Sequence, residues 1–545
     1  MAPGSTDEGL RLLANPQRPA PFDPPSPPRG CRDRPLVPTL VRGMTRTPIA
    51  AFSGLARLVL TLLVLLATAD IGPAVQDLGP PTIKRWTLSR NTEFATEVWS
   101  IEAREPGPTV LVVAGIHGDE RAGVEAALAI SNWSIDAGRL VVVPRANPPA
   151  LAAGTRRIPG VEDGEGDLNR RFADRVPSGS HAKSLWRLVR QVDPDWLLDL
   201  HEGFAVRRLD PDSVGHSVIT CDDPVALDLA RRLVDRVDRG ITDEEKRFTL
   251  LRNPIRGSLA ARAWESREVR SMILETCKRE GRLPERARRH REMVHEALTD
   301  LGMGPSSPET LVDPDRQDRE LCVALYGDSG SSSNSLKNTR KALAGEVLVL
   351  EVDATDILAG SLDPFHAVIL PGGTMSGQAR SLGSEGRERL QEFVRRGGGY
   401  LGICAGAYLG AANYTTSLGL LPVDVIDREH WNRGIGNVEV RASRPGRRIL
   451  GAPARSFDLY YYNGPILAPT QEADQEEAPP YVTLLTYRGD IAKPGVPGGV
   501  MPGTPAAIAG DHGSGRVILL GPHPEATEGR EPFLVRALSW LARQE

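Results

Sequence analysis

The chain has 545 residues, which is too long for a single hydrophobic core and predicts two or three domains. Its hydrophobic content of 40% and its charged content of 25% are typical of a globular protein. The formal net charge is −4, and no basic block stands out among the scattered arginines, so nucleic acid is excluded as an expected partner.

The N-terminal segment has two parts of different composition. Residues 1–43 are rich in Pro, Arg and Gly without apolar periodicity, which predicts a disordered or untranslated extension. Residues 44–69 have the pattern of a secretory signal, with an apolar run at 58–67 and an Ala-Thr-Ala cleavage site at 67–69. The run is shorter than the roughly 20 residues that span a membrane. We therefore expect export to the periplasm or the cell exterior; the alternative is an uncleaved N-terminal membrane anchor.

Residues 80–301 show the alternation of strands and helices that is typical of an α/β domain. Short exposed strands are expected at 80–105. Further on, the predicted strands lie at 109–115, 140–144, 196–200 and 271–275, and the predicted helices lie at 122–130, 181–192 and 284–301. This order predicts a sheet that is covered by helices on both faces.

The pattern stops at residues 302–319, where Pro, Gly, Ser and charged residues predict a linker. A second α/β domain is expected over 320–545. Its predicted strands lie at 321–327, 347–352, 367–370, 400–403, 506–510 and 516–521, whereas residues 423–475 are less regular.

Five cysteines occur in the chain, and Cys31 would be lost with the leader. The other four, at positions 221, 277, 322 and 404, show neither C-x-x-C pairing nor the density of a disulfide scaffold. We therefore predict no disulfide bond.

Three metal-ligating side chains follow two of the predicted strands. His117 and Glu120 lie in Gly-Ile-His-Gly-Asp-Glu after the strand at 109–115, and His201 ends the strand at 196–200. Catalytic zinc takes three protein ligands of these types and keeps a fourth position for water. The carboxyl ends of strands in α/β sheets are where ligand sites form. Asp199 or Glu202 is expected to hold the second ring nitrogen of His201.

Hydrolysis at such a zinc site needs a carboxylate that takes a proton from water, and Glu275 in Ile-Leu-Glu-Thr is the candidate. An isolated His-x-x-Glu pattern is more often a loop histidine beside solvated acids. Here four motifs occur together in workable order, which favours the zinc hydrolase. They are Gly-Ile-His117-Gly-Asp-Glu120, Asp167-Leu-Asn169-Arg170, Asp199-Leu-His201-Glu and Leu-Glu275-Thr.

With these motifs, residues 80–300 resemble the aspartoacylase/succinylglutamate desuccinylase branch of the zinc carboxypeptidase superfamily. The resemblance implies a mixed sheet with helices on both faces and a zinc-activated water that attacks an amide carbonyl. It implies His117, Glu120 and His201 as zinc ligands, Glu275 as general base, Arg156 as the residue that polarises the carbonyl, and Asn169 with Arg170 as the grip on a substrate carboxylate. The guanidinium of an arginine such as Arg170 can donate two parallel hydrogen bonds to one carboxylate. The neighbouring Arg157 and Arg171 remain alternatives to Arg156 and Arg170 for these two roles.

The superfamily contains N-acyl amino acid deacylases and periplasmic murein-peptide amidases, so the expected partner is a small peptide or an acyl amino acid. The export signal favours a cell-wall peptide. Residues 257–259, Gly-Ser-Leu, resemble the Gly-Ser segment of the murein-peptide enzymes. A small acyl amino acid is the competing substrate.

The second domain has a candidate nucleophile at Cys404. Small residues on both sides, in Gly-Ile-Cys-Ala-Gly-Ala, suit the sharp strand-to-helix turn of a nucleophile elbow. His523 and Glu525, in Gly-Pro-His-Pro-Glu, supply a base and its orienting carboxylate. Gly372 and Gly373 end a strand, where their amides are expected to be free for an oxyanion hole. We expect Cys404 to be partly exposed at a helix start.

This stretch resembles the flavodoxin-like class I glutamine amidotransferase fold, and its full motif set is similar to the N-terminal domain of biotin-protein ligases. No ligase domain follows within the chain, so biotin transfer is not expected. The sequence predicts an exported zinc-dependent hydrolase with a second thiol-amidase-like domain. The alternative is an N-acyl amino acid deacylase whose C-terminal domain is an inert ligand-binding module.

Overall fold

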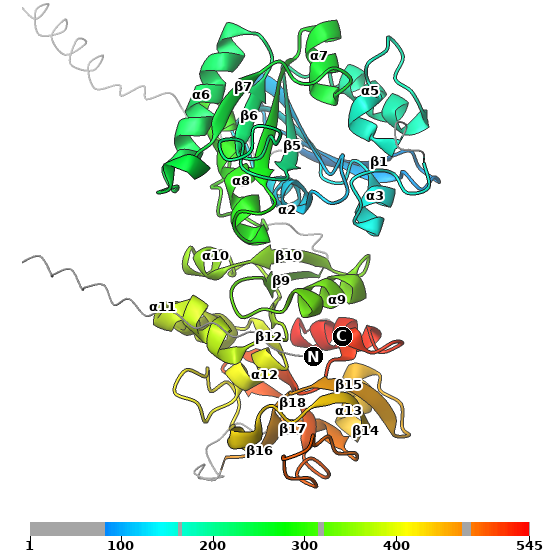
Figure 1. Ribbon diagram of the computed structural model, residues 1–545, viewed down its shortest axis with the longest axis vertical. Coiled ribbons are helices and arrows are strands. Elements are labelled where there is room, and N and C mark those ends of the chain that lie inside the picture. The colour runs from blue at the N-terminus through cyan, green and yellow to red at the C-terminus, as the bar shows by residue number, and fades with distance from the viewer. Residues whose placement is uncertain (1–81, 162–165, 314–320, 471–480, 544–545) are drawn as a thin grey trace, which may run out of the picture. The chain divides into compact units, whose positions relative to one another are not determined.

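A computed structural model of the protein describes residues 82–161, 166–313, 321–470 and 481–543. The predicted extension and signal segment lie outside these residues. The described residues form one compact unit, which is built around two large sheets (Figure 1). Among the helices of the described residues, none has the length and apolar character needed to cross a membrane.

The first sheet has eight strands in the order β1-β2-β4-β3-β5-β8-β6-β7. Their bounds are β1 (Thr82–Leu88), β2 (Thr96–Glu102), β3 (Glu105–Ala114), β4 (Ala137–Val143), β5 (Trp196–Gly203), β6 (Ser217–Thr220), β7 (Thr249–Arg252) and β8 (Arg270–Cys277). The central strands β4, β3, β5 and β8 are parallel, whereas β2 and β6 join them antiparallel. The sheet is therefore mixed, as expected.

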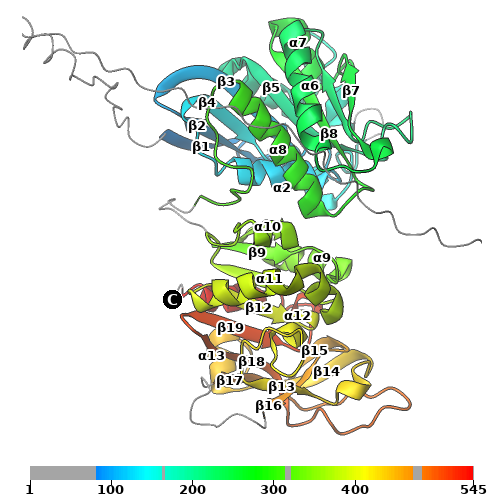
Figure 2. The same cartoon turned by 90° about the vertical axis from the view of Figure 1, so that its left-hand side faces the viewer.

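Helices cover both faces of this sheet. The first face carries α2 (Arg121–Ile130), α6 (Pro224–Asp238) and α8 (Leu283–Asp300), and the second carries α5 (Ser180–Val192) and α7 (Leu259–Arg267). Figure 2 shows α6 and α8 lying across one face. Because side chains alternate along a strand, Val110 and Val112 of β3 enter the first core, and Leu111 and Val113 enter the second. Burial on both faces explains the unbroken apolar run of β3.

The second sheet has the order β10-β9-β11-β12-β19-β18-β17-β14-β15. Its strands are β9 (Cys322–Tyr326), β10 (Leu348–Val352), β11 (Ala367–Leu370), β12 (Gly399–Ile403), β14 (Ile435–Ala442), β15 (Phe457–Tyr462), β17 (Tyr481–Tyr487), β18 (Pro505–His512) and β19 (Gly515–Leu520). The strands from β10 to β19 in this order are parallel, and the others are antiparallel. A separate pair joins β13 (Val423–Ile426) to β16 (Ile466–Pro469).

Helices again cover both faces of the second sheet. One core contains side chains of α9 (Ser333–Leu343), α13 (Arg444–Leu450) and α14 (Pro532–Leu541), and the other contains side chains of α10 (Ala354–Leu358), α11 (Met375–Arg395) and α12 (Ala405–Gly410). The expectation of two α/β domains is thus confirmed; the boundaries between them stay a prediction.

Two parts of the chain are more ordered than the sequence suggested. The stretch 423–475 contains β13, β14, α13, β15 and β16 before residues 471–480, which lie outside the described residues. Alternate residues of β14 are exposed, so it lacks the apolar run of a central strand. In the predicted linker, Leu311 and Val312 are each only 2% exposed, and Thr310 O accepts a 2.9 Å hydrogen bond from Trp133 Nε1. This part of the linker is packed.

Arginines of α8 pair with carboxylates at the start of α10. Arg288 donates to Asp353 at 2.7 Å and to Asp356 at 2.9 Å, and the buried Arg291 donates to Asp356 at 3.0 Å. Removing one member of such a network would leave a buried charge uncompensated. Loss of one member is therefore expected to destabilise the protein.

Candidate active site

The three predicted metal ligands lie together at the carboxyl end of the first sheet. His117 follows β3, Glu120 immediately precedes α2, and His201 lies in β5. Each is 2% exposed. Glu120 Oε1 lies 2.9 Å from His117 Nδ1, Glu120 Oε2 lies 2.8 Å from His201 Nδ1, and the two Nδ1 atoms are 3.2 Å apart. The structure thus brings the three side chains to one point.

This donor set fits a metal ion. One ligand atom from each of the three residues lies within 4.8 Å of the others. Two imidazole nitrogens and one carboxylate oxygen are ligands that zinc takes in catalytic sites. Burial opposes the charged form of Glu120, but the facing rings of His117 and His201 hold the pKa of its carboxyl well below the usual range. A buried carboxylate between two imidazoles provides the charge that a divalent cation needs.

Two aspartates orient the histidine rings. Asp199 Oδ2 lies 3.1 Å from His201 Nε2, at ion-pair distance but without a hydrogen bond to the described residues, so the first of the two predicted candidates is the one beside this ring. Glu202 instead accepts hydrogen bonds from the Ala122 amide at 2.8 Å and from Arg286 at 2.7 Å. A carboxylate on the far nitrogen of a ligating histidine fixes the orientation of its ring.

Asp167 performs the same function for the other histidine, and the sequence reasoning missed it. Its Oδ1 lies 3.1 Å from His117 Nε2. Burial opposes ionisation of this aspartate, but the hydrogen bond to His117 and the nearby arginines lower the pKa of Asp167 to about 2. The signal was present in the motif Asp-Leu-Asn-Arg, which begins with this residue.

Glu275 lies beside the ligands because β8 pairs with β5 in parallel, with Glu275 opposite His201 in the register. It is 7% exposed, and its Oε2 makes no hydrogen bond within the described part of the chain. Burial raises the pKa of Glu275 to about 8, with Glu120 also raising it and His201 opposing. A carboxyl with this pKa can take and give a proton near neutral pH.

The predicted carbonyl-polarising Arg156 and the predicted substrate-binding residues Asn169 and Arg170 lie around the same centre. Arg156 donates to Glu120 Oε1 at 2.7 Å, and its side chain is 43% exposed. Asn169 Nδ2 lies 3.4 Å from His201 Nε2, and its Oδ1 accepts from the Leu259 amide at 3.1 Å. Arg170 is next to Asn169 in a short 3-10 turn and donates to Asn169 O at 2.9 Å. Each predicted residue of the first domain is therefore at or next to the ligand cluster.

The candidate thiol of the second domain lies in a sharp turn between β12 and α12. Cys404 has φ +50° and ψ −100°, a backbone conformation that costs free energy in a residue with a side chain. A Cβ on Gly402 would lie 2.5 Å from Gly406 O, so the turn requires glycine there. This geometry is that of a nucleophile elbow.

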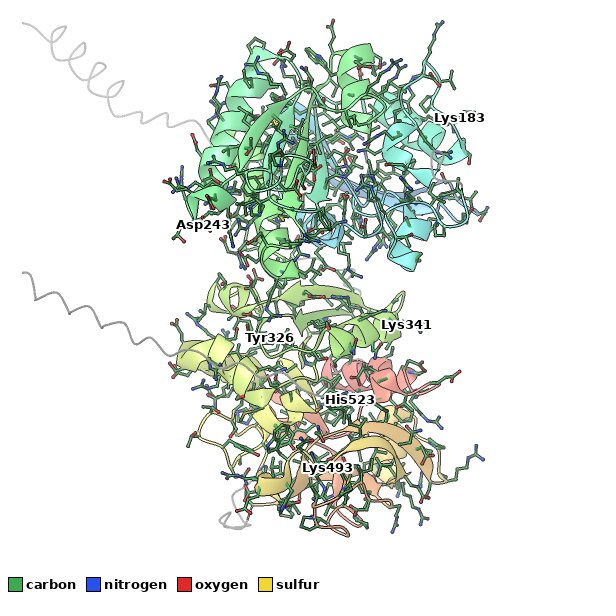
Figure 3. All side chains as sticks on the ribbon, in the orientation of Figure 1. Lys183, Asp243, Tyr326, Lys341, Lys493 and His523 are labelled. Carbon is green, nitrogen blue, oxygen red and sulfur yellow. The ribbon has the colours of Figure 1, made fainter. Side chains whose placement is uncertain are left out.

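His523, labelled in Figure 3, is buried and close enough to Cys404 to interact with it electrostatically, but its Nε2 makes no hydrogen bond with the described residues. The distance between His523 Nδ1 and Glu525 Oε1 is 2.8 Å. Burial opposes the charged ring, but Glu525 and Cys404 raise the pKa of His523 to about 10. The structure therefore brings the predicted Cys, His and Glu together.

Two expectations for this thiol site are wrong. Cys404 is only 5% exposed, because it is covered by the chain at β15, where Tyr462 O accepts from its Sγ at 3.4 Å. The Gly372 amide is not free, since it donates to Ser335 Oγ at 2.9 Å. Among the described residues, no disulfide joins the cysteines at 221, 277, 322 and 404.

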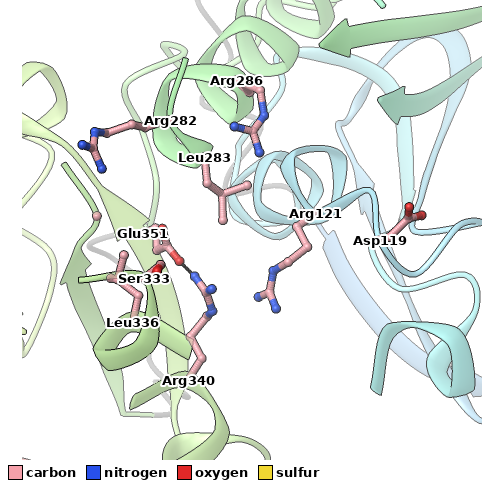
Figure 4. A pocket seen from close by; sticks show the side chains of 10 residues that line it. Asp119, Arg121, Arg282, Leu283, Arg286, Ser333, Leu336, Arg340 and Glu351 are labelled. Atoms are coloured by element: carbon pink, nitrogen blue, oxygen red, sulfur yellow. Dashed lines mark ion pairs between the residues drawn. The ribbon is translucent and has the colours of Figure 1, made fainter. Parts of the chain in front are cut away.

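A separate pocket of about 280 Å³ is lined by several arginines, among them Arg121, Arg282 and Arg340 (Figure 4). Arg340 pairs with Glu351 in this view. Arg121 lies 3.4 Å from Glu125, and Arg282 lies 3.6 Å from Asp328. Since these arginines are paired with carboxylates of the chain, we assign the pocket no anionic ligand.

Comparison with known proteins finds two domain families in the chain. Residues 106–210 match the succinylglutamate desuccinylase/aspartoacylase catalytic domain, and residues 321–432 match the N-terminal domain of biotin-protein ligase. Both families agree with the resemblances found in the sequence, and the first is a family of catalytic domains. The prediction of an enzyme is confirmed at this level.

Individual relatives cover only parts of the chain. N-alpha-acetyl-L-2,4-diaminobutyric acid deacetylase of Halomonas elongata is 36% identical over 122 residues, which are 22% of this chain and 35% of that protein. Biotin-protein ligase of Schizosaccharomyces pombe is 34% identical over 98 residues, or 16% of this chain and 15% of that protein. Among solved structures, the product-bound cell shape determinant Csd4 of Helicobacter pylori is 20% identical with a TM-score of 0.35, covering 40% of this chain and 58% of that one.

Proposed function

We propose that this chain, which joins a succinylglutamate desuccinylase/aspartoacylase catalytic domain to a biotin-protein ligase N-terminal domain, is a zinc-dependent hydrolase of amide bonds. The observation that carries the proposal is the convergence of His117, Glu120 and His201 in one buried cluster. When bound there, zinc would lower the pKa of a water and polarise the carbonyl of the substrate.

The residues around the ligands supply the other parts of the reaction. Glu275 is buried beside His201 and accepts the proton of the attacking water, which it then gives to the leaving nitrogen. Arg156 reaches the same cluster from a partly exposed position, where its guanidinium stabilises negative charge on the carbonyl oxygen. The site therefore contains a base and a cation in addition to the metal ligands.

We place the carboxylate of the substrate at Asn169 and Arg170. Arg170→Lys is expected to raise KM for a substrate with a free carboxylate by about tenfold or more, because a lysine cannot replace the two parallel hydrogen bonds of the guanidinium. KM for the amidated analogue is expected to change little. The measurement compares both substrates in wild type, Arg170→Lys and, as a matched control, Arg171→Lys. Equal losses on the two substrates would remove Arg170 from this role.

The proposed substrate class is a small peptide or an acyl amino acid with a free carboxylate. The relative of Halomonas elongata, by its name, is a deacetylase of an acetylated amino acid, which supports the acyl amino acid. The predicted export signal supports a cell-wall peptide. Incubation of the zinc-loaded protein with muropeptides and with acyl amino acids, followed by mass spectrometry, separates the two substrates. No cleavage in either set would contradict the proposal.

We further propose that the protein is exported. This rests on the charged, apolar and small-residue regions of segment 44–69. The alternative, an uncleaved anchor, would leave this segment on the protein and hold it at the membrane.

The second domain is proposed to be a thiol amidase, because Cys404 lies in a strained turn beside the His523 and Glu525 pair. The other candidate for this domain is an inert module that holds a ligand for the first domain. The rate at which iodoacetamide modifies Cys404 distinguishes the two functions, because only a thiol amidase needs a reactive thiol.

A further inference from the structure

A buried serine joins two parts of the thiol site that are far apart in the sequence. Ser335 lies in the first turn of α9 and is 5% exposed. Its Oγ donates to Glu525 Oε1 at 2.9 Å and accepts from the Gly372 amide at 2.9 Å. The hydroxyl thus uses both its donor and an acceptor site within the domain.

The chain after β11 is in contact with the catalytic histidine. A Cβ on Gly372 would lie 2.6 Å from His523 Cε1 and 3.2 Å from Ser335 Oγ, so the ring packs directly on this glycine. A Cβ on Gly406, in the first turn of α12, would lie 2.1 Å from Leu370 O. The segment from Leu370 to Gly372 therefore runs from the turn that holds Cys404 to the ring of His523.

Glu525 has few other partners. Its Oε1 accepts from both His523 Nδ1 and Ser335 Oγ, whereas its Oε2 is buried and makes no hydrogen bond with the described residues. Without Ser335, the Glu525 carboxylate would keep one hydrogen-bond partner among the described residues, the ring of His523. A carboxylate held at one point can rotate, and the ring that it orients would follow it.

We propose that Ser335 is a positioning residue of the thiol site, whose hydroxyl sets the orientation of His523 through Glu525 and the placement of the backbone after β11 in a single hydrogen-bonded chain. This inference rests on the proposed thiol function of the second domain. The substrate of that site is taken to be an amide, as the proposed thiol function implies.

The reaction that Ser335 would support balances without a further reactant than water. The thiol of Cys404 gives its proton to His523 as its sulfur forms a bond to the carbonyl carbon. The carbon–nitrogen bond then breaks, and His523 gives that proton to the leaving nitrogen. Water then cleaves the thioester, which yields a carboxylic acid and restores the thiol. Both steps require the His523 ring to point at the sulfur. Ser335 holds the ring in this orientation through Glu525.

The test measures the rate at which iodoacetamide modifies Cys404 in the full chain as a function of pH, with peptide mass spectrometry to locate the label. In wild type, Cys404 is expected to react faster at neutral pH than the thiols at 221, 277 and 322. Ser335→Ala is expected to lower this rate roughly tenfold, the size of one hydrogen bond to a charged group, and to move the pH profile of the reaction to higher pH. Ser335→Thr keeps the hydroxyl and is expected to restore both.

Two further variants show through which residue Ser335 acts. Ser333→Ala changes an exposed serine two positions away on α9 and is expected to leave rate and profile unchanged. In a Glu525→Gln background, Ser335→Ala is expected to have little further effect, because both changes remove the same connection. Thermal unfolding of each variant monitors folding, and a looser fold alone would raise the rates of all buried thiols together.

The outcomes separate this inference from the thiol function on which it rests. If His523→Ala slows the reaction and Ser335→Ala leaves rate and profile at wild-type values, Ser335 has no positioning role and the thiol function stands. Additive effects of Ser335→Ala and Glu525→Gln would also overturn the inference. If Cys404 reacts no faster than the other thiols and His523→Ala changes nothing, the thiol function itself is wrong and the domain is a ligand-binding module.

Discussion

Replacement of His201 by alanine is expected to reduce bound zinc from about one ion per chain to a trace and to abolish amide hydrolysis. His201 Nδ1 lies 2.8 Å from Glu120 Oε2 and 3.2 Å from His117 Nδ1, so it supplies one of three converging ligand atoms. A catalytic zinc site with two protein ligands left binds the ion weakly. Metal content is measured by mass spectrometry after gel filtration, and activity is measured on the same samples.

A matched control is available in the same domain. His295 lies on α8, where its ring contacts Trp133, and it is not one of the three converging residues, so His295→Ala is expected to retain both zinc and activity. If His201→Ala kept a full equivalent of zinc, the assignment of the ligands would have to be abandoned.

Glu275→Gln is expected to leave zinc bound and to lower kcat by about 10²-fold or more, the usual effect of removing a general base. The glutamine has nearly the same shape as the glutamate but cannot take a proton. Glu275 is opposite His201 in the register of β8 and β5, so the substitution is made next to the ligands without changing one of them. Steady-state kinetics and metal content are measured together.

The control for this variant is Glu265→Gln, which changes an exposed carboxylate on α7 and should have wild-type kinetics. Loss of zinc from Glu275→Gln would make Glu275 a ligand instead of a base. An unchanged kcat with zinc in place would exclude it from proton transfer.

The central strands of both sheets could be predicted because burial on two faces leaves an unbroken apolar run. This holds for residues 110–114 of β3 in the first sheet and for β11 and β12 in the second, whereas in β5 the apolar run is interrupted by Asp199. Strands nearer the sheet margins were harder to predict. Alternate residues of the strand β14 are exposed and polar side chains occur among them. Its apolar content is therefore as low as that of a loop.

The ligand residues could be predicted because each lies at or just after the end of a recognisable strand. The residues that position them could not, since their roles depend on contacts across long stretches of chain. Asp167 reaches a histidine 50 residues away, and Ser335 reaches a carboxylate 190 residues away. The burial of Cys404 also depends on Tyr462 of β15, which no local pattern around the cysteine indicates.

The most direct test of a zinc centre at His117, Glu120 and His201 is an anomalous diffraction map of zinc-loaded crystals of the protein, recorded at the zinc absorption edge. We expect one peak in the first domain, at about 2.0–2.2 Å from a ring nitrogen of each histidine and from a carboxylate oxygen of Glu120. Glu275 should be close to the peak without contacting the ion. A zinc peak at another group of residues, or no peak at this cluster in crystals that contain a full equivalent of zinc, would contradict the proposed function.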